Sequence, residues 1–155
     1  MGIESRNKGK RGERTAALYL RGMGFPDAGR TAQRSGKLKA DVECLITLPD
    51  VHIEVKRDKR FTGGTEPLVR ALAQATRDCG DMMPCVLWKP PRAKRWHLTF
   101  HSTTYPPVML TVMTDADIKT ILLHLQDLGA LRQTRPAARP EELPPTMKGT
   151  QPCPP

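Results

Sequence analysis

Alternating apolar and polar side chains between residues 40 and 57 predict two neighbouring β-strands. In the first strand, apolar side chains hold every second position: Ala40, Val42, Cys44, Ile46 and Leu48. In the second, Val51, Ile53 and Val55 alternate with His52, Glu54 and Lys56. Pro49-Asp50 predicts the turn between them. Because alternate residues of a strand share a face, Glu54 and Lys56 are expected side by side. An antiparallel first strand would bring Asp41 to that face.

Helical periodicity appears in three segments around these strands. Residues 8–23 carry an apolar stripe that Gly24 closes, and residues 66–79 carry a second stripe. A third helix is expected to be capped by Asp115 and ended by Gly129. Further short strands are expected at residues 30–36, 85–88, 96–100 and 108–112. The order α-β-β-β-α-β-β-β-α predicts an α/β fold with a mixed central β-sheet flanked by helices.

The composition changes near the C-terminal end of the sequence. From Arg132 onward there are seven prolines in 24 residues and almost no large apolar side chain. Such a segment buries too little surface to offset its ordering entropy. We therefore predict one folded domain over residues 1–131, with a basic N-terminal part, and a Pro-rich disordered tail over residues 132–155.

The formal charge of +9 is concentrated in the first 40 residues and just after Lys56. Such a concentration favours nucleic acid, although a solvated basic face would explain it equally well. Side chains expected to contact DNA are Lys8, Lys10, Arg11, Arg30, Gln33, Arg34, Ser35, Lys37, Lys39 and Arg57. The cysteines show no paired Cys-x-x-Cys spacing, which argues against a zinc site or a disulfide framework. With neither a signal peptide nor a transmembrane run apparent, a cytoplasmic protein without membrane contacts is expected.

Asp41, Glu54 and Lys56 together predict a site for phosphodiester hydrolysis. Carboxylates are hard ligands that suit Mg²⁺, and an ammonium can orient the attacking water or stabilise developing negative charge. The backbone carbonyl of Val55 is a further candidate ligand. Glu13 lies on the apolar stripe of the first helix and could reach the metal. The alternative for Glu13 is an exposed glutamate favoured by the helix dipole. For Glu54 and Lys56 it is a weak surface ion pair.

Four segments together resemble the PD-(D/E)XK nuclease superfamily, and archaeal-type Holliday junction resolvases and their small phage-encoded relatives in particular. These segments are Asn7-Lys-Gly-Lys-Arg-Gly-Glu13, Gly29-Arg-Thr-Ala-Gln-Arg-Ser-Gly36, Ala40-Asp-Val42 and His52-Ile-Glu-Val-Lys-Arg57. The resemblance covers about residues 5–80. It implies a single restriction-endonuclease-like domain with an αβββαβ core and a homodimer that acts on four-way junctions. It also implies a Mg²⁺ site, at which Mn²⁺ can substitute, formed by Glu13, Asp41, Glu54 and Lys56.

Three neighbouring residues complete this interpretation. Gln74 matches the glutamine that these nucleases often carry in the following helix, although an exposed amide on the helix surface is an equal alternative. Asp50 follows a literal Pro49, but it stands only four residues before Glu54 and is interpreted as a turn residue. His52 shares the face of Glu54 and is expected to be a half-exposed strand histidine rather than a contact to metal or phosphate.

The function expected from the sequence is a Mg²⁺-dependent, structure-selective DNA endonuclease, specifically a Holliday junction resolvase. If the chain is phage-encoded, the compartment is the host cytoplasm. A related nuclease acting on duplex, flapped or single-stranded DNA is the alternative within the enzyme class. A DNA-binding protein that keeps a nuclease fold without cleaving is the alternative from another class.

Overall fold

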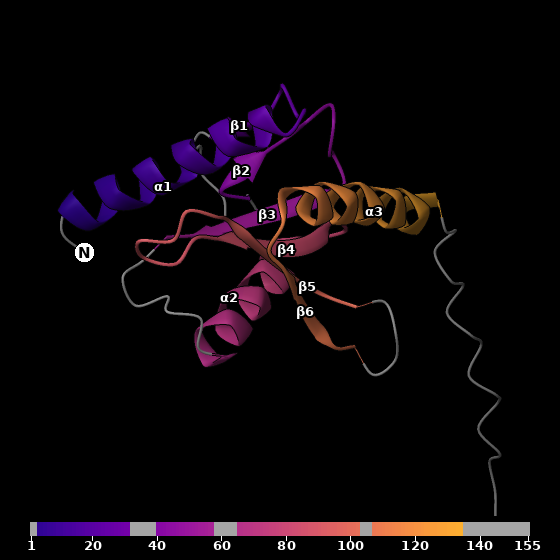
Figure 1. The fold of residues 1–155 in the computed structure, drawn as a ribbon. Coiled ribbons are helices and arrows are strands. Elements are labelled where there is room, and N and C mark those ends of the chain that lie inside the picture. Colours follow the sequence, from indigo (N-terminus) through magenta and orange to yellow (C-terminus); the bar gives the residue numbers. More distant parts are fainter. Residues whose placement is uncertain (1–2, 32–39, 58–64, 103–106, 135–155) are drawn as a thin grey trace, which may run out of the picture.

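A computed structural model describes residues 3–31, 40–57, 65–102 and 107–134, with side chains described from residue 9 onward. In these ranges three helices and six strands follow the predicted order (Figure 1). They are α1 (Ile3–Gly22), β1 (Gly29–Arg30), β2 (Val42–Glu43), β3 (Val51–Lys56), α2 (Thr65–Asp78), β4 (Met83–Trp88), β5 (His97–His101), β6 (Met109–Val112) and α3 (Asp115–Thr134). The predicted α/β class is confirmed. None of the described helices combines the length and apolarity needed to cross a bilayer.

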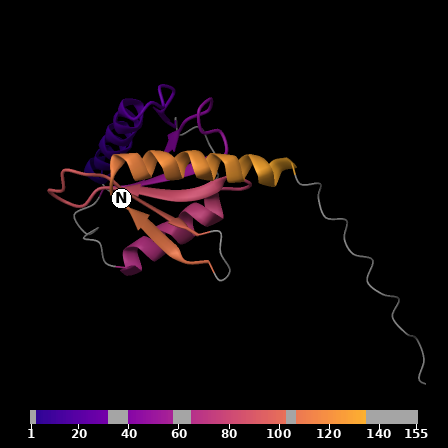
Figure 2. The same cartoon turned by 45° about the vertical axis from the view of Figure 1, so that its right-hand side comes forward.

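The six strands form one mixed sheet in the order β1-β2-β3-β4-β5-β6. Only β3 and β4 pair in parallel, and the other neighbouring pairs are antiparallel. A parallel pair needs a crossover connection, which here contains α2. Figures 1 and 2 show α2 on one face of the sheet and α1 and α3 on the other. Both faces of β3 are therefore covered, and its first five residues are buried.

Two apolar clusters hold these layers together. Beneath α1 and α3, Ile53 and Val55 of β3 pack with Leu20 of α1 and Leu122 of α3. On the opposite face, four α2 side chains pack against two residues of β4; the set is Leu68, Ala71, Leu72, Ala75, Val86 and Trp88. Each fully buried aliphatic side chain contributes about 1.5–3 kcal/mol to stability. The middle strands thus form a rigid support for polar side chains at their ends.

The prediction that Gly24 closes α1 is confirmed. Gly24 adopts a positive φ of 99°, which ends the helix. The N–H of Phe25 donates to the carbonyl of Leu20, and that of Gly24 donates to the carbonyl of Arg21, each at 3.1 Å. This pair of bonds is a Schellman motif, which favours glycine at the left-handed position. The start of α1 differs from the prediction, since the helix begins at Ile3 rather than near residue 8.

The strand predicted over residues 40–48 is wrong beyond Glu43. The carboxylate of Asp27 accepts hydrogen bonds from the N–H groups of Ile46 (2.7 Å) and Thr47 (3.2 Å) and from the Thr47 hydroxyl. These bonds hold residues 45–47 in a turn and leave Leu45 and Ile46 exposed, while Leu48 is buried. The connection from β2 to β3 is therefore longer than the predicted two-residue turn.

The predicted limits of the last helix need two corrections. Its N-cap is Thr114 rather than Asp115, because the Thr114 hydroxyl accepts a bond from the N–H of Asp117 at 3.1 Å. Gly129 does not end α3, which continues to Thr134. The first three residues of the predicted tail are thus helical, and residues 135–155 lie outside the described part of the chain.

Gly129 lies within α3 at the position where Asp50 packs directly against the helix, so a residue without a side chain is needed there. Asp50 is buried, as expected of a structural turn residue, and its side chain accepts bonds from the amides of Gln126 (2.5 Å) and Gln133. Its backbone N–H donates to the Gln126 side-chain oxygen at 2.8 Å. A Cβ added at Gly129 would lie 2.5 Å from the Asp50 Cβ and 2.8 Å from its carbonyl oxygen. The turn before β3 and the last helix are therefore locked together.

Gly129→Ala is expected to destabilise the protein by about 1–3 kcal/mol, because the added methyl group overpacks this contact. In an open helix position the same change would stabilise by up to about 1 kcal/mol. Gly22→Ala in α1 is the matched control, since no atom lies within 4 Å of its added Cβ. Urea denaturation of the three proteins measures the difference. Equal midpoints for Gly129→Ala and the wild type would contradict the contact.

Candidate active site

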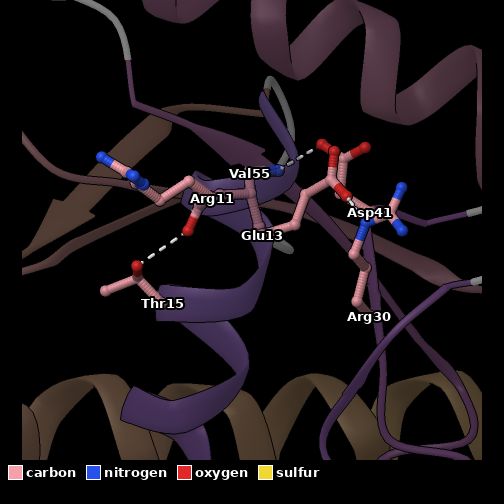
Figure 3. Close-up of polar contacts among 6 residues, drawn as sticks. All are labelled: Arg11, Glu13, Thr15, Arg30, Asp41 and Val55. Atoms are coloured by element: carbon pink, nitrogen blue, oxygen red, sulfur yellow. Dashed lines mark hydrogen bonds and ion pairs between the residues drawn. The ribbon is translucent and has the colours of Figure 1, made fainter. Parts of the chain in front are cut away.

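Asp41 and Glu54 are brought together by the pairing of β2 with β3. Val42 is the register partner of Ile53, so the residues that flank this pair, Asp41 and Glu54, occupy neighbouring positions. The N–H of Asp41 donates to the carbonyl of Ile53 at 3.1 Å. The Asp41 carboxylate in turn accepts a bond from the N–H of Val55 at 2.9 Å (Figure 3). The predicted antiparallel arrangement of the two strands is confirmed at this point.

The electrostatic environment of Asp41 disfavours its charged form. Partial burial and the negative charges of Glu54 and Glu13 together raise the pKa of Asp41 to about 6, against the opposing effects of the Val55 N–H and Lys56. Among the described residues, no cationic side chain forms an ion pair with Asp41. A partly buried carboxylate beside like charges is stabilised by a cation brought in from solution.

Lys56 is held between a carboxylate and an amide. Its ammonium donates to Glu54 at 2.6 Å and to the side-chain oxygen of Gln74 at 3.1 Å. Glu54 is only 4% exposed, because α2 covers this face of β3. The alternative interpretations, a surface ion pair and an exposed amide, are therefore wrong for Glu54 and Gln74. Through Gln74, α2 contacts the Lys56 ammonium directly and helps to hold it in place.

Glu13 reaches the same region from α1, where it pairs with Arg30 of β1 (Figure 3). Both side chains are mostly buried, at 16% and 22% exposure for Glu13 and Arg30. Since α1 begins at Ile3, Glu13 lies in the middle of the helix and not in its first turn. The helix-dipole explanation for Glu13 is therefore wrong, and its cationic partner is an arginine.

The predicted ligand set fits a divalent cation only in part. Within the described ranges, no three or more His, Cys, Asp or Glu side chains are grouped in a way that could hold a metal ion. Mg²⁺, however, is commonly held by one or two carboxylates and completes its coordination with waters and substrate oxygens. Asp41 and Glu54 supply two such carboxylates, and the N–H bond to Asp41 holds the backbone of Val55 beside them. Because Glu13 pairs with Arg30, its carboxylate would have to contact both Arg30 and the cation to act as a third ligand.

Two buried polar side chains next to the carboxylates lack hydrogen-bond partners. His52 is completely buried, and neither of its ring nitrogens has a hydrogen-bond partner among the described residues; the same holds for the hydroxyl of Thr31. The expectation of a half-exposed His52 is therefore wrong, because α2 covers it. Burial lowers the pKa of His52, which favours the neutral ring, although the charges of Glu54 and Asp78 oppose this effect. Thr31, whose N–H donates to the Asp41 carbonyl at 3.3 Å, belongs to one of the resembling segments but was not predicted as a site residue.

The basic residues predicted to contact DNA are described only in part. Arg57 follows Lys56 and donates to the Thr15 hydroxyl of α1 at 3.0 Å, and Arg11 is exposed on the same helix. Lys10 is half-buried, and Lys8 belongs to the part of α1 whose side chains are not described. Gln33, Arg34, Ser35, Lys37 and Lys39 lie outside the described residues.

The cluster formed by Asp41, Glu54, Lys56 and Gln74 has a definite chemical capacity. Buried Glu54 and half-buried Asp41, the latter without an ion-pair partner among the described residues, can bind a hard divalent cation. The ammonium beside them can hold a water or a phosphoryl oxygen. Comparisons with protein-family models, with curated proteins and with solved structures each find no match to this chain.

Proposed function

We propose that this chain is a Mg²⁺-dependent, structure-selective DNA endonuclease with a restriction-endonuclease-like domain. One observation carries the proposal: half-buried Asp41 lies beside Glu54 and forms no ion pair with any described residue, and its partial burial and the Glu54 charge raise its pKa to about 6. Two neighbouring carboxylates repel each other and lower the stability of the folded protein, so their proximity suggests a function. A divalent cation bound between them would remove this repulsion and stabilise the folded protein.

The residues of the cluster have distinct roles in this proposal. Asp41 and Glu54 would hold Mg²⁺, and Mn²⁺ in its place. When bound, the metal would lower the pKa of a water molecule and neutralise charge on the phosphoryl oxygens. Lys56 would hold the attacking water or a phosphoryl oxygen, while Gln74 and Glu54 keep its ammonium in place. Glu13 would act from α1, with Arg30 as its counterion until substrate arrives.

DNA is the proposed substrate because basic side chains lie next to this cluster in the sequence and on the neighbouring helix α1. Arg57 lies directly after Lys56, and exposed Arg11 and Arg14 are carried by α1. Phosphate backbones are attracted to such a surface in a strongly salt-dependent manner. The four-way junction as the preferred substrate, and a homodimer that places two sites across it, are supported by the sequence resemblance. Duplex, flapped and single-stranded DNA are the competing substrates.

A DNA-binding protein without cleavage activity is the second candidate, and specific contacts favour it. Glu13 and Glu54 are each neutralised by a cation from the chain itself, namely Arg30 and Lys56. Residues 3–31, 40–57, 65–102 and 107–134 also contain no group of three metal-ligating side chains. Such internal neutralisation would let acidic residues remain in a surface that binds phosphate.

Cleavage of labelled substrates separates these candidates. Purified protein is incubated with equimolar four-way junction and linear duplex of the same arm sequences, in Mg²⁺ or in EDTA. Paired symmetric nicks at the junction that require Mg²⁺ are expected. Equal cutting of both substrates would keep the nuclease and exclude junction selectivity. Binding of both without cutting would establish the second candidate.

A further inference from the structure

The loop between β4 and β5 carries an unusual concentration of charge. Its seven residues, Lys89 to Arg95, include four cations, no acidic side chain and two prolines. Arg92, Lys94 and Arg95 are exposed, and Lys89 is half-buried. Over the described parts of the chain, none of the four forms an ion pair. The Lys89 ammonium lies over the Trp96 ring, 5.9 Å from its centroid, so the charges of Arg92, Lys94 and Arg95 are the ones available to a partner. The loop lies beyond the region that resembles known nucleases.

This loop begins beside the carboxylate cluster. Because β3 and β4 run parallel, their carboxyl ends meet at one edge of the sheet. The N–H of Lys89 donates to the carbonyl of Lys56 at 3.2 Å, which joins the loop to the lysine that contacts Glu54. Figures 1 and 2 both show the loop extending from the sheet on the side of the N-terminal half of α1.

The loop is held in one conformation at its tip and at its base. At the tip, the N–H of Ala93 donates to the carbonyl of Pro90 at 3.1 Å, and Arg92 has a φ of 63°. This is the third position of a turn that normally favours glycine, because a side chain is strained there. At the base, Trp96 is buried and stacks on Tyr19 of α1, with 5.6 Å between ring centroids. A strained backbone at an arginine is an observation that points to a role for its side chain.

We propose that the Lys89–Arg95 loop binds the phosphate backbone of the DNA on which the carboxylate cluster acts, so that it is a second contact outside that cluster. This inference rests on the substrate class proposed above. Guanidinium groups bind phosphate oxygens in a bidentate manner, and Lys94 adds a further charge. Arg57 follows Lys56, to which the loop is hydrogen-bonded, and it also contacts Thr15 of α1, the helix that carries exposed Arg11. A duplex lying over the cluster would be held on both sides of the cleaved phosphate.

Binding measured without cleavage tests the loop directly. Fluorescence anisotropy of a labelled duplex and a labelled four-way junction is recorded in EDTA at several salt concentrations. The variants are Arg92→Gly and the double variant Lys94→Ala/Arg95→Ala. Arg77→Ala is the control, because exposed Arg77 lies in the last turn of α2, which leads to the opposite end of β4. Melting curves of all four proteins accompany the titrations.

Each lost phosphate contact should weaken affinity about tenfold near 0.1 M salt and reduce the slope of log affinity against log salt by about one. Arg92→Gly is expected to melt no lower than the wild type, because glycine relieves the strained φ. It therefore separates loss of DNA contact from loss of folding. Arg77→Ala should bind like the wild type.

The outcomes distinguish this inference from the proposed function. If the wild type binds DNA and the loop variants bind equally well, or if Arg77→Ala loses as much affinity as they do, the loop contact is overturned while the nuclease proposal stands. If only the loop variants lose affinity, the contact stands even when the wild type does not cleave. If the wild type binds neither the duplex nor the four-way junction, both the loop contact and the proposed function are refuted.

Discussion

Asp41→Asn is expected to abolish cleavage and, at the same time, to make the metal-free protein more stable at neutral pH. An amide is a poor ligand for a divalent cation, so cleavage should fall by at least about 10²–10³-fold. The amide oxygen can still accept the bond from the Val55 N–H, so the strand pairing is kept. Without the Asp41 charge, DNA should bind at least as tightly as to the wild type.

The gain in stability follows from the raised pKa of Asp41. In the folded protein the group titrates at about 6, whereas an unfolded aspartate titrates near its ordinary value of 3.8. The folded state therefore binds the proton more tightly, and the associated stability is present below about pH 4 and lost as pH rises through about 6. Above that pH the ionised carboxylate costs the folded state on the order of 1–3 kcal/mol. The neutral amide of the Asp41→Asn variant carries no such cost.

Urea denaturation in EDTA at pH values from 4 to 8 measures this difference. The unfolding free energies of Asp41→Asn and the wild type should diverge between about pH 4 and pH 6 and stay apart above it. Added Mg²⁺ should raise the stability of the wild type at pH 8 and have little effect on the variant. Asp81→Asn, a change of an exposed aspartate, is the control. A variant less stable than the wild type at pH 8 in EDTA would refute the electrostatic argument.

Removing the ammonium of Lys56 should have a comparably large effect on turnover. We expect Lys56→Ala and Glu54→Gln each to lower the cleavage rate by at least about 10²-fold, because each removes a group expected to contact metal, water or phosphate. Glu54→Gln keeps the size of a side chain that is 4% exposed and should remain folded. Lys56→Ala leaves Glu54 buried without its cation, which should cost about 1–3 kcal/mol of stability. Unchanged rates in both variants would exclude this site.

A double-mutant cycle shows whether Gln74 acts through Lys56. Gln74 contacts the ammonium at 3.1 Å and is expected to position it. Gln74→Ala alone should then slow cleavage about 10-fold, and adding it to Lys56→Ala should change nothing further. Fully additive losses would show that Gln74 contributes independently of Lys56. Circular dichroism of each variant establishes that the fold is retained.

The sequence pattern located the cluster because strand periodicity is local. Alternation placed Glu54 and Lys56 on one face, and the antiparallel pairing of Val42 with Ile53 brought Asp41 to them. Strand periodicity does not predict how deeply that face is buried. His52 and Glu54 are polar, so the pattern predicts that they are partly exposed, but α2, which follows later in the chain, covers them.

Two of the errors share one physical cause, which is a contact between segments distant in the sequence. Residues 45–47 alternate like a strand, but the Asp27 carboxylate binds the N–H groups of Ile46 and Thr47 and turns the chain. Gly129 looks like a helix end, but its missing side chain makes room for Asp50. Neither partner is visible from local propensity, since each lies at least 19 residues away in the sequence.

The strand order also has a consequence for how the protein is made. Each strand of the sheet lies beside the strand that precedes it in the chain, so the sheet can grow one strand at a time during synthesis. Every residue of the carboxylate cluster is contributed by the segment that ends with α2, and α3 is the last of the described elements to be synthesised. Nascent chains that stop before Asp115 would hold the acids and the lysine but would expose the apolar face that Ile118, Leu122 and Leu125 cover. Synthesis thus completes the chemical groups before it supplies the helix that shields the core from aggregation.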